Sequence, residues 1–192
     1  MNPSALPVQQ LVARAKDGSL STADVDEVVQ RLKSEAPGES TYRLLYVVGR
    51  TGATRHESLV ASFLDCQEDP MLARLALQTL CTFWGKSDQY LSDLRRFVAG
   101  VDWDTDGDVQ QVALSAAGEY LRHNRDRTLF QSVFNACTKA LGGEVDQRVA
   151  LAALARALGT PQAELSTSYL KRSRPQLLIQ AASWLDSHSP DE

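Results

Sequence analysis

The sequence predicts an all-α protein built from repeated helical hairpins, and three observations lead to this prediction. Apolar residues recur at helical spacing along most of the chain. No segment shows the strict alternation, with enrichment in Val, Ile or Thr, that is typical of a strand. One helical pattern also returns twice at a fixed interval, which indicates a stack of repeats.

The repeat is clearest in three segments that align without gaps. Ala76, Ala113 and Ala150 are separated by 37 residues each, and a leucine follows each of them. Every segment has apolar residues along one helix face, and its alanine lets a neighbouring helix approach closely. A second apolar helix follows each segment. The expected unit is therefore a helix, a short turn, a second helix and a loop to the next unit.

Helix start and stop signals place the units along the chain. Asp69 is an expected N-cap with Pro70 at the first helical position, and Thr22 is expected to cap an earlier helix. Gly159 stands where a helix ends, and Pro175 is expected to open the last helix. We expect a single repeat domain over residues 1–192, with N-terminal capping helices in 1–37, repeats at 42–66, 69–99, 106–141 and 144–172, and a C-terminal capping helix at 175–186.

The composition excludes several classes of function. The 192 residues are 43% hydrophobic and 23% charged, as in globular proteins. A formal net charge of -4 argues against a protein held to nucleic acid by charge. No run of about eighteen apolar residues predicts a membrane span, and residues 1–7 do not resemble a secretory signal. Three distant cysteines, Cys66, Cys81 and Cys137, favour a reduced, cytoplasmic chain over a disulfide framework.

Two segments resemble HEAT-like repeats, namely Asp69-Pro70-x-x-x-Arg74-x-Ala76-Leu77 and Asp106-Gly107-Asp108-Val109-x-x-Val112-Ala113-Leu114. The resemblance is good over residues 69–159, fair over 42–66 and poor at both ends. The chain departs from the pattern at Glu144, where the first unit has Pro70, and at Gln111, where Arg74 and Arg148 stand in the other units. The resemblance implies a short right-handed α-solenoid of HEAT-like hairpins with capping helices at both ends.

HEAT-like proteins mostly bind other macromolecules along the concave face that their second helices line. A short, acidic chain of this kind also resembles the bacterial HEAT-like immunity proteins that neutralise antibacterial toxins. This resemblance implies a cytoplasmic, non-catalytic inhibitor that binds a protein partner, a basic cognate toxin, and needs no cofactor. A general scaffold or adaptor protein is the alternative that the sequence does not separate from it.

The run Asp102-Trp103-Asp104-Thr105-Asp106-Gly107-Asp108 is the most unusual segment of the sequence. Asp at its first, third and fifth positions resembles the start of an EF-hand calcium loop, but Ala113 stands where the final Glu ligand belongs. A second interpretation is that Asp106 or Asp108 caps the following helix. A third is a docking surface for a basic partner, with an aromatic anchor. Its expected residues are Asp102, Trp103, Asp104, Asp106 and Asp108.

The sequence contains no set of residues that predicts catalysis or metal binding. His56, His123 and His188 are far apart, and no paired-cysteine, phosphate-loop or nucleophile-elbow motif is present. The enzyme alternative is a HEAT-like DNA glycosylase for alkylated bases. Such an enzyme has Trp and Asp residues at its cleft, and Asp102, Trp103 and Asp104 could imitate them. Such an enzyme needs a basic channel, which the net charge argues against. Small basic clusters, such as Lys171, Arg172 and Arg174, are interpreted as solvated helix faces.

Overall fold

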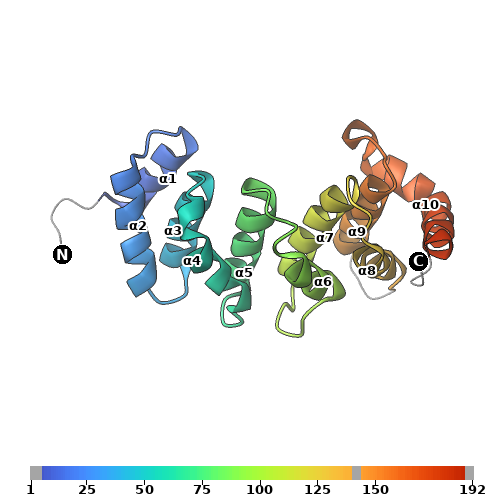
Figure 1. The fold of residues 1–192 in the computed structure, drawn as a ribbon, viewed down its shortest axis with the longest axis horizontal. Helices are drawn as coiled ribbons and strands as arrows, with labels where there is room; N and C mark the ends of the chain where they lie inside the picture. Colours follow the sequence, from blue (N-terminus) through green and yellow to red (C-terminus); the bar gives the residue numbers. More distant parts are fainter. Residues whose placement is uncertain (1–5, 140–143, 189–192) are drawn as a thin grey trace. The chain divides into compact units, whose positions relative to one another are not determined.

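The computed structural model describes residues 6–139 and 144–188, and in these residues it contains helices and no strand (Figure 1). The all-α prediction is thus confirmed for the described part of the chain. The chain divides into two compact units, Met1–Lys86 and Ser87–Glu192, each of which is described by itself below. The residues expected at the start of the N-terminal cap (1–5) and at the end of the third repeat (140–141) lie outside the described ranges.

The first unit is organised around one helix, α3 (Glu39–Arg50), which packs against α1, α2 and α5. Its side chains Leu44, Leu45, Val47 and Val48 are fully buried. The second helix expected in the 42–66 repeat is a short α-helix that continues as a 3-10 turn. The elements are α1 (Val8–Lys16), α2 (Thr22–Ser34), α3, η1 (Thr54–His56), α4 (Glu57–Ala61), η2 (Ser62–Asp65), α5 (Pro70–Leu77) and η3 (Gln78–Phe83).

Two helices of this unit, α2 and α5, begin with a side-chain cap. Asp69 caps α5 by accepting a hydrogen bond from the backbone N–H of Met71, as expected. The N-cap of α2 is Ser21 and not Thr22. Ser21 and Asp24 form a capping box, in which each side chain accepts a hydrogen bond from the other residue's backbone N–H. This reciprocal arrangement satisfies two N–H groups at once, whereas a cap at Thr22 would satisfy one.

The helix that begins at Pro70 changes its hydrogen-bond pattern at Gln78. The segment η3 is a π-helix, in which backbone hydrogen bonds join residues five apart and not four apart as in an α-helix. Trp84 follows it and is half-buried, and its indole N–H donates to the carbonyl of Gly49 on α3 at 3.0 Å. Trp84 therefore lies only partly in the core, and its indole N–H binds a carbonyl in the last turn of α3.

The second unit holds five α-helices and a 3-10 turn within its described residues. They are α6 (Leu91–Ala99), α7 (Asp108–Leu121), α8 (Arg127–Thr138), α9 (Glu144–Ala157), η4 (Gln162–Glu164) and α10 (Thr167–Ser187). Helix α7 packs against α9, α6 packs against α8, and α10 contacts both α8 and α9. Consecutive helices also contact each other, as α6 does α7. Two rows of helices result in this unit, one of α6, α8 and α10 and one of α7 and α9.

The alanines that define the repeat are buried as predicted. Ala76, Ala113 and Ala150 are at most 2% exposed, and the leucines that follow them are at most 5% exposed. In the second unit the small residues bring α7 and α9 into close contact. The burial of these positions supports the alignment of the three segments, because a wrong register would turn some of them to solvent.

The C-terminal end differs from the prediction of two helices separated near Pro175. The structure has one continuous helix, α10, with Pro175 inside it. Proline removes one backbone hydrogen bond and costs about 3 kcal/mol in a regular helix interior. The buried residues Leu170, Leu177, Ala181 and Leu185 nevertheless lie on one face across the proline. Burying this continuous face outweighs the single lost hydrogen bond. Trp184 stacks here on Phe130 of α8, with ring centroids 4.1 Å apart.

Candidate functional site

The aspartate-rich run forms the loop between α6 and α7 in the second unit. Gly100 ends α6 with φ 94°, and Gly107 precedes α7 with φ 72°; both values favour glycine. Between them the backbone makes two successive turns. The N–H of Asp104 donates to the carbonyl of Val101, and the N–H of Gly107 donates to that of Asp104. These turns fold the loop back beside the N-terminus of α7.

The helix cap in this loop is Asp104, and the prediction of Asp106 or Asp108 is wrong. The N-cap position itself is Gly107, which has no side chain to accept a hydrogen bond. The carboxylate of Asp104 accepts the backbone N–H of Gln110 at 2.9 Å instead. The tight turns of the loop bring this carboxylate over the first turn of α7, where the helix dipole also favours a negative charge.

The second carboxylate oxygen of Asp104 is an unsatisfied acceptor within the site. This Oδ1 atom is buried and has no hydrogen-bond partner among the described residues. A buried acceptor without a donor costs free energy, more so when it belongs to a charged group. A donor that reached this oxygen would therefore gain a strong, charge-assisted hydrogen bond.

The predicted aromatic anchor, Trp103, is half-buried against the core of its own unit. Its ring meets the ring of Phe97 edge to face, with centroids 6.0 Å apart and planes at 80°. Phe97 is fully buried in α6. The contact fixes the position of the loop, and only part of the Trp103 side chain remains available to a partner.

A cavity of about 420 Å³ lies beside the loop, and three of the five predicted residues line it. These are Asp102, Asp104 and Asp106, whereas Trp103 and Asp108 do not line it. The remaining walls come from α7, the end of α8 and the start of α9, and contribute Gln110, Leu114, Ala136, Lys139, Asp146, Gln147 and Ala150. This cavity, which we call the acidic cavity, is the candidate functional site.

Asp146 is the acidic residue of the cavity that sequence reasoning missed. It lies on α9 and accepts a hydrogen bond from the side-chain amide of Gln111 on α7 at 3.1 Å. The repeat alignment contains a signal for it. Asp146 occupies the position that is Leu72 in the first segment and the fully buried Val109 in the second. A polar residue at an apolar repeat position is a reason to suspect a role at the surface.

Among the described residues, the acidic cavity has four lining carboxylates and one lining cation. The cation, Lys139, donates from its ammonium group to the carbonyl of Ala99 at 3.3 Å. Ala99 is the last residue of α6, so this lysine also compensates the negative end of that helix. The excess of carboxylates gives the cavity a negative potential, which attracts cationic side chains.

The calcium interpretation gains no support from the described residues. In them, no three His, Cys, Asp or Glu side chains come together in a way that could hold a metal ion. Ala113, at the twelfth position of the proposed loop, is fully buried inside α7. The chain has therefore already turned into a helix where an EF-hand presents its last ligand.

Several other reactive side chains are buried or paired within the fold. Cys81 and Cys137 are buried, and burial raises the pKa of the Cys137 thiol to about 12. His56 lies 3.2 Å from a carboxylate oxygen of Asp26. Arg95 pairs with Asp126, the residue that caps α8. Each of these contacts stabilises a helix end or the core.

None of the described helices combines the length and the apolar character that crossing a bilayer requires. Comparison of the chain with known protein families, with curated proteins and with solved structures gives no match.

Proposed function

We propose that this chain is a short HEAT-like α-solenoid that binds a protein partner without catalysis, and that it is an immunity-type inhibitor of a basic cognate toxin in the bacterial cytoplasm. The two rows of helices within the second unit support the solenoid, because each helix contacts the next of its own row. Such stacking is how helical hairpins bury a face that a single hairpin leaves open.

The acidic cavity is the observation that carries the functional part of the proposal. Asp102 and Asp106 are exposed at the loop, and Asp104 and Asp146 are partly buried. A lysine or arginine of the partner would enter between these carboxylates. An arginine fits best, because its several N–H groups can donate to two carboxylates, such as those of the exposed Asp102 and Asp106, at the same time.

Inhibition would follow from occlusion. A toxin that cleaves or binds nucleic acid uses cationic side chains to hold phosphates, and an acidic surface competes for those side chains. Complementary charge also speeds the encounter of the two proteins. The same lining argues against the glycosylase alternative, because four carboxylates repel the DNA backbone that such an enzyme must hold.

The test is binding to the protein encoded by the neighbouring gene, measured by calorimetry, together with protection of cells that produce it. We expect submicromolar binding and protection, both reduced at least tenfold by Asp102→Asn with Asp106→Asn. The matched control is Glu27→Gln with Glu68→Gln, which removes the same charge from exposed positions of the first unit. Binding without protection would favour an adaptor, and the absence of both would overturn the proposal.

A further inference from the structure

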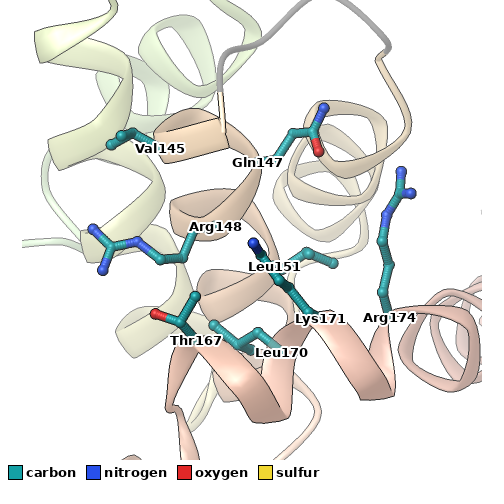
Figure 2. Close-up of a pocket in the computed structure, with 8 residues that line it drawn as sticks. All are labelled: Val145, Gln147, Arg148, Leu151, Thr167, Leu170, Lys171 and Arg174. Carbon is teal, nitrogen blue, oxygen red and sulfur yellow. The ribbon is translucent and has the colours of Figure 1, made fainter.

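A second cavity in the Ser87–Glu192 unit has the opposite charge. It lies between α9 and α10, has a volume of about 490 Å³, and is shown in Figure 2. Arg148, Lys171 and Arg174 line it, and none of the lining residues that the structure describes is acidic. The volume lies within the range of about 300–1,000 Å³ that is usual for ligand sites.

Each of the two walls of the cavity is formed by residues on one face of a helix. Thr167, Leu170, Lys171 and Arg174 follow each other at intervals of three, one and three residues, which places them on one face of α10. Arg148 and Leu151 are three residues apart on α9 and face this row. The cavity thus joins two helices that already pack against each other, so its walls are fixed by the core.

Two of its cations have no acidic partner among the described residues. Arg148 and Arg174 form no ion pair and no hydrogen bond with an acidic residue in the described part of the chain. Arginines elsewhere in the same unit do pair, as Arg95 does with Asp126 and Arg96 does with Asp93. Two unpaired guanidinium groups at one cavity are available for an anionic ligand.

The cations are spread along the cavity and do not converge on one point. In Figure 2, Arg148 extends to one side and Arg174 to the other, while Lys171 lies between them next to Leu151. A single phosphate would draw cations toward one centre. Charges placed in a row suit a ligand that carries several anionic groups along its length.

Apolar side chains lie between and beside these cations. Leu151 and Leu170 form part of the lining, and Val145 at its edge is 53% exposed. From Thr167 to Arg174 the face of α10 spans about 10 Å, which equals about three residues of an extended peptide. Gln147 and Thr167 add hydrogen-bonding groups for a peptide backbone.

We propose that this cavity, the basic cavity, binds a short acidic peptide segment of a protein partner, with an apolar side chain over the leucines and carboxylates at the flanking cations. The basic cavity adjoins the acidic cavity, because Gln147 lines both, but no charged residue lines both. A nucleic acid is the less favoured polyanion, because the acidic cavity lies on the neighbouring face of α9 and repels a long phosphate chain.

The test is a calorimetric titration of the full-length protein with the blocked peptide acetyl-Asp-Glu-Leu-Glu-Asp-amide at low ionic strength. We expect saturable binding that weakens as salt is added. The variant Arg148→Gln with Arg174→Gln should bind about tenfold more weakly. The control is Arg125→Gln with Arg172→Gln, which removes the same charge from exposed residues outside the cavity and should bind as the wild type does.

Three results would overturn the proposal. They are an absence of peptide binding, an equal loss of binding in both arginine pairs, and tighter binding of a single-stranded oligothymidylate than of the peptide. Val145→Glu gives a second check, because it places a negative charge at an exposed edge without disturbing the core, and it should also block the peptide. Asp102→Asn with Asp106→Asn should leave peptide binding intact, so failure of the proposed function is distinguishable from failure of this site.

Discussion

Gly118 of α7 lies so close to Ala153 of α9 that no side chain fits between the two helices. A Cβ atom added to Gly118 would stand 2.7 Å from the Ala153 Cα atom and 2.8 Å from its carbonyl oxygen. Both of these are backbone atoms, so a change of rotamer cannot relieve the contact. The glycine is thus what allows α7 and α9 to approach as closely as they do.

We expect Gly118→Ala to destabilise the protein by about 2 kcal/mol. Alanine favours a helix by about 1 kcal/mol over glycine, but overpacking at a backbone contact costs about 3 kcal/mol. Urea unfolding measures the difference. Ser115→Ala, at an exposed position of the same helix, is the control and should stay within about 0.5 kcal/mol of wild type. Adding Ala153→Gly should not restore stability, because the clash is with its backbone. Wild-type stability of Gly118→Ala would refute the close approach.

Two buried threonines of the first unit should respond to valine with opposite signs. The hydroxyl of Thr79 in η3 is buried without a hydrogen-bond partner in the described structure, whereas that of Thr41 donates to the carbonyl of Ala36. Thr79→Val removes an unsatisfied group and should stabilise by about 1 kcal/mol. Thr41→Val breaks a buried hydrogen bond and should destabilise by a similar amount. Thermal unfolding of both variants compares them, and equal signs would contradict the assignment.

Of the three loop aspartates that line the acidic cavity, we expect Asp104 to contribute to stability and the other two to contribute little. Asp104→Ala removes the acceptor for the Gln110 N–H and should cost about 1 kcal/mol, as the loss of a helix cap does. Asp102→Ala and Asp106→Ala change exposed side chains and should stay within about 0.5 kcal/mol of wild type. Chemical unfolding of the three variants tests this. A large loss of stability in Asp106→Ala would instead support Asp106 as the helix cap.

The sequence predicts well those features of this protein that depend on local periodicity. The buried positions Ala76, Ala113 and Ala150 follow from the spacing of apolar residues, and the Asp69 cap follows from the dipeptide that it forms with Pro70. Each of these features depends on neighbours within one or two helical turns, so the sequence pattern contains the necessary information.

Features that depend on distant packing were missed. The continuous α10 helix forms because Leu170 and Leu177 bury the same face, and this tertiary gain outweighs a proline that locally favours a break. The acidic cavity needs Asp146, which reaches the Asp-rich loop only because α9 packs on α7. The capping role of Asp104 depends on two turns of the loop whose geometry the residue pattern does not specify.

The capping box of α2 should give Asp24 an acid-sensitive contribution to folding. Hydrogen bonds from Ser21 hold the pKa of Asp24 below its usual value of 3.8, and Arg14 adds to this effect. A carboxyl group whose pKa is lowered by folding stabilises the fold above its unfolded pKa, and this contribution is lost as pH falls through the folded pKa. Ser21→Ala should therefore raise the pKa of Asp24 toward 3.8 and reduce the loss of stability below about pH 4.

Carboxyl chemical shifts in an NMR titration measure this pKa directly. Asp26 is the internal control, because its pKa is lowered mainly by its hydrogen bond with Arg55 and should not respond to Ser21→Ala. An unchanged pKa of Asp24 in the variant would show that the Ser21 hydroxyl does not determine the shift, and would leave it to the backbone N–H of residue 21 and to Arg14.

Replacing Pro175 in α10 tests whether the helix tolerates the proline or requires it. Pro175 is exposed and has no N–H to donate to the carbonyl of Lys171, four residues earlier. If α10 only tolerates the proline, Pro175→Ala restores one hydrogen bond and should stabilise by about 1–2 kcal/mol, which is less than the full penalty because the helix has already adapted. Gln176→Ala, at the exposed neighbouring position, controls for helix propensity.

A loss of stability in Pro175→Ala would mean that the proline bends α10 so that Leu170 and Leu177 are both buried. The basic cavity would then depend on the same bend, because Lys171 and Arg174 directly precede it.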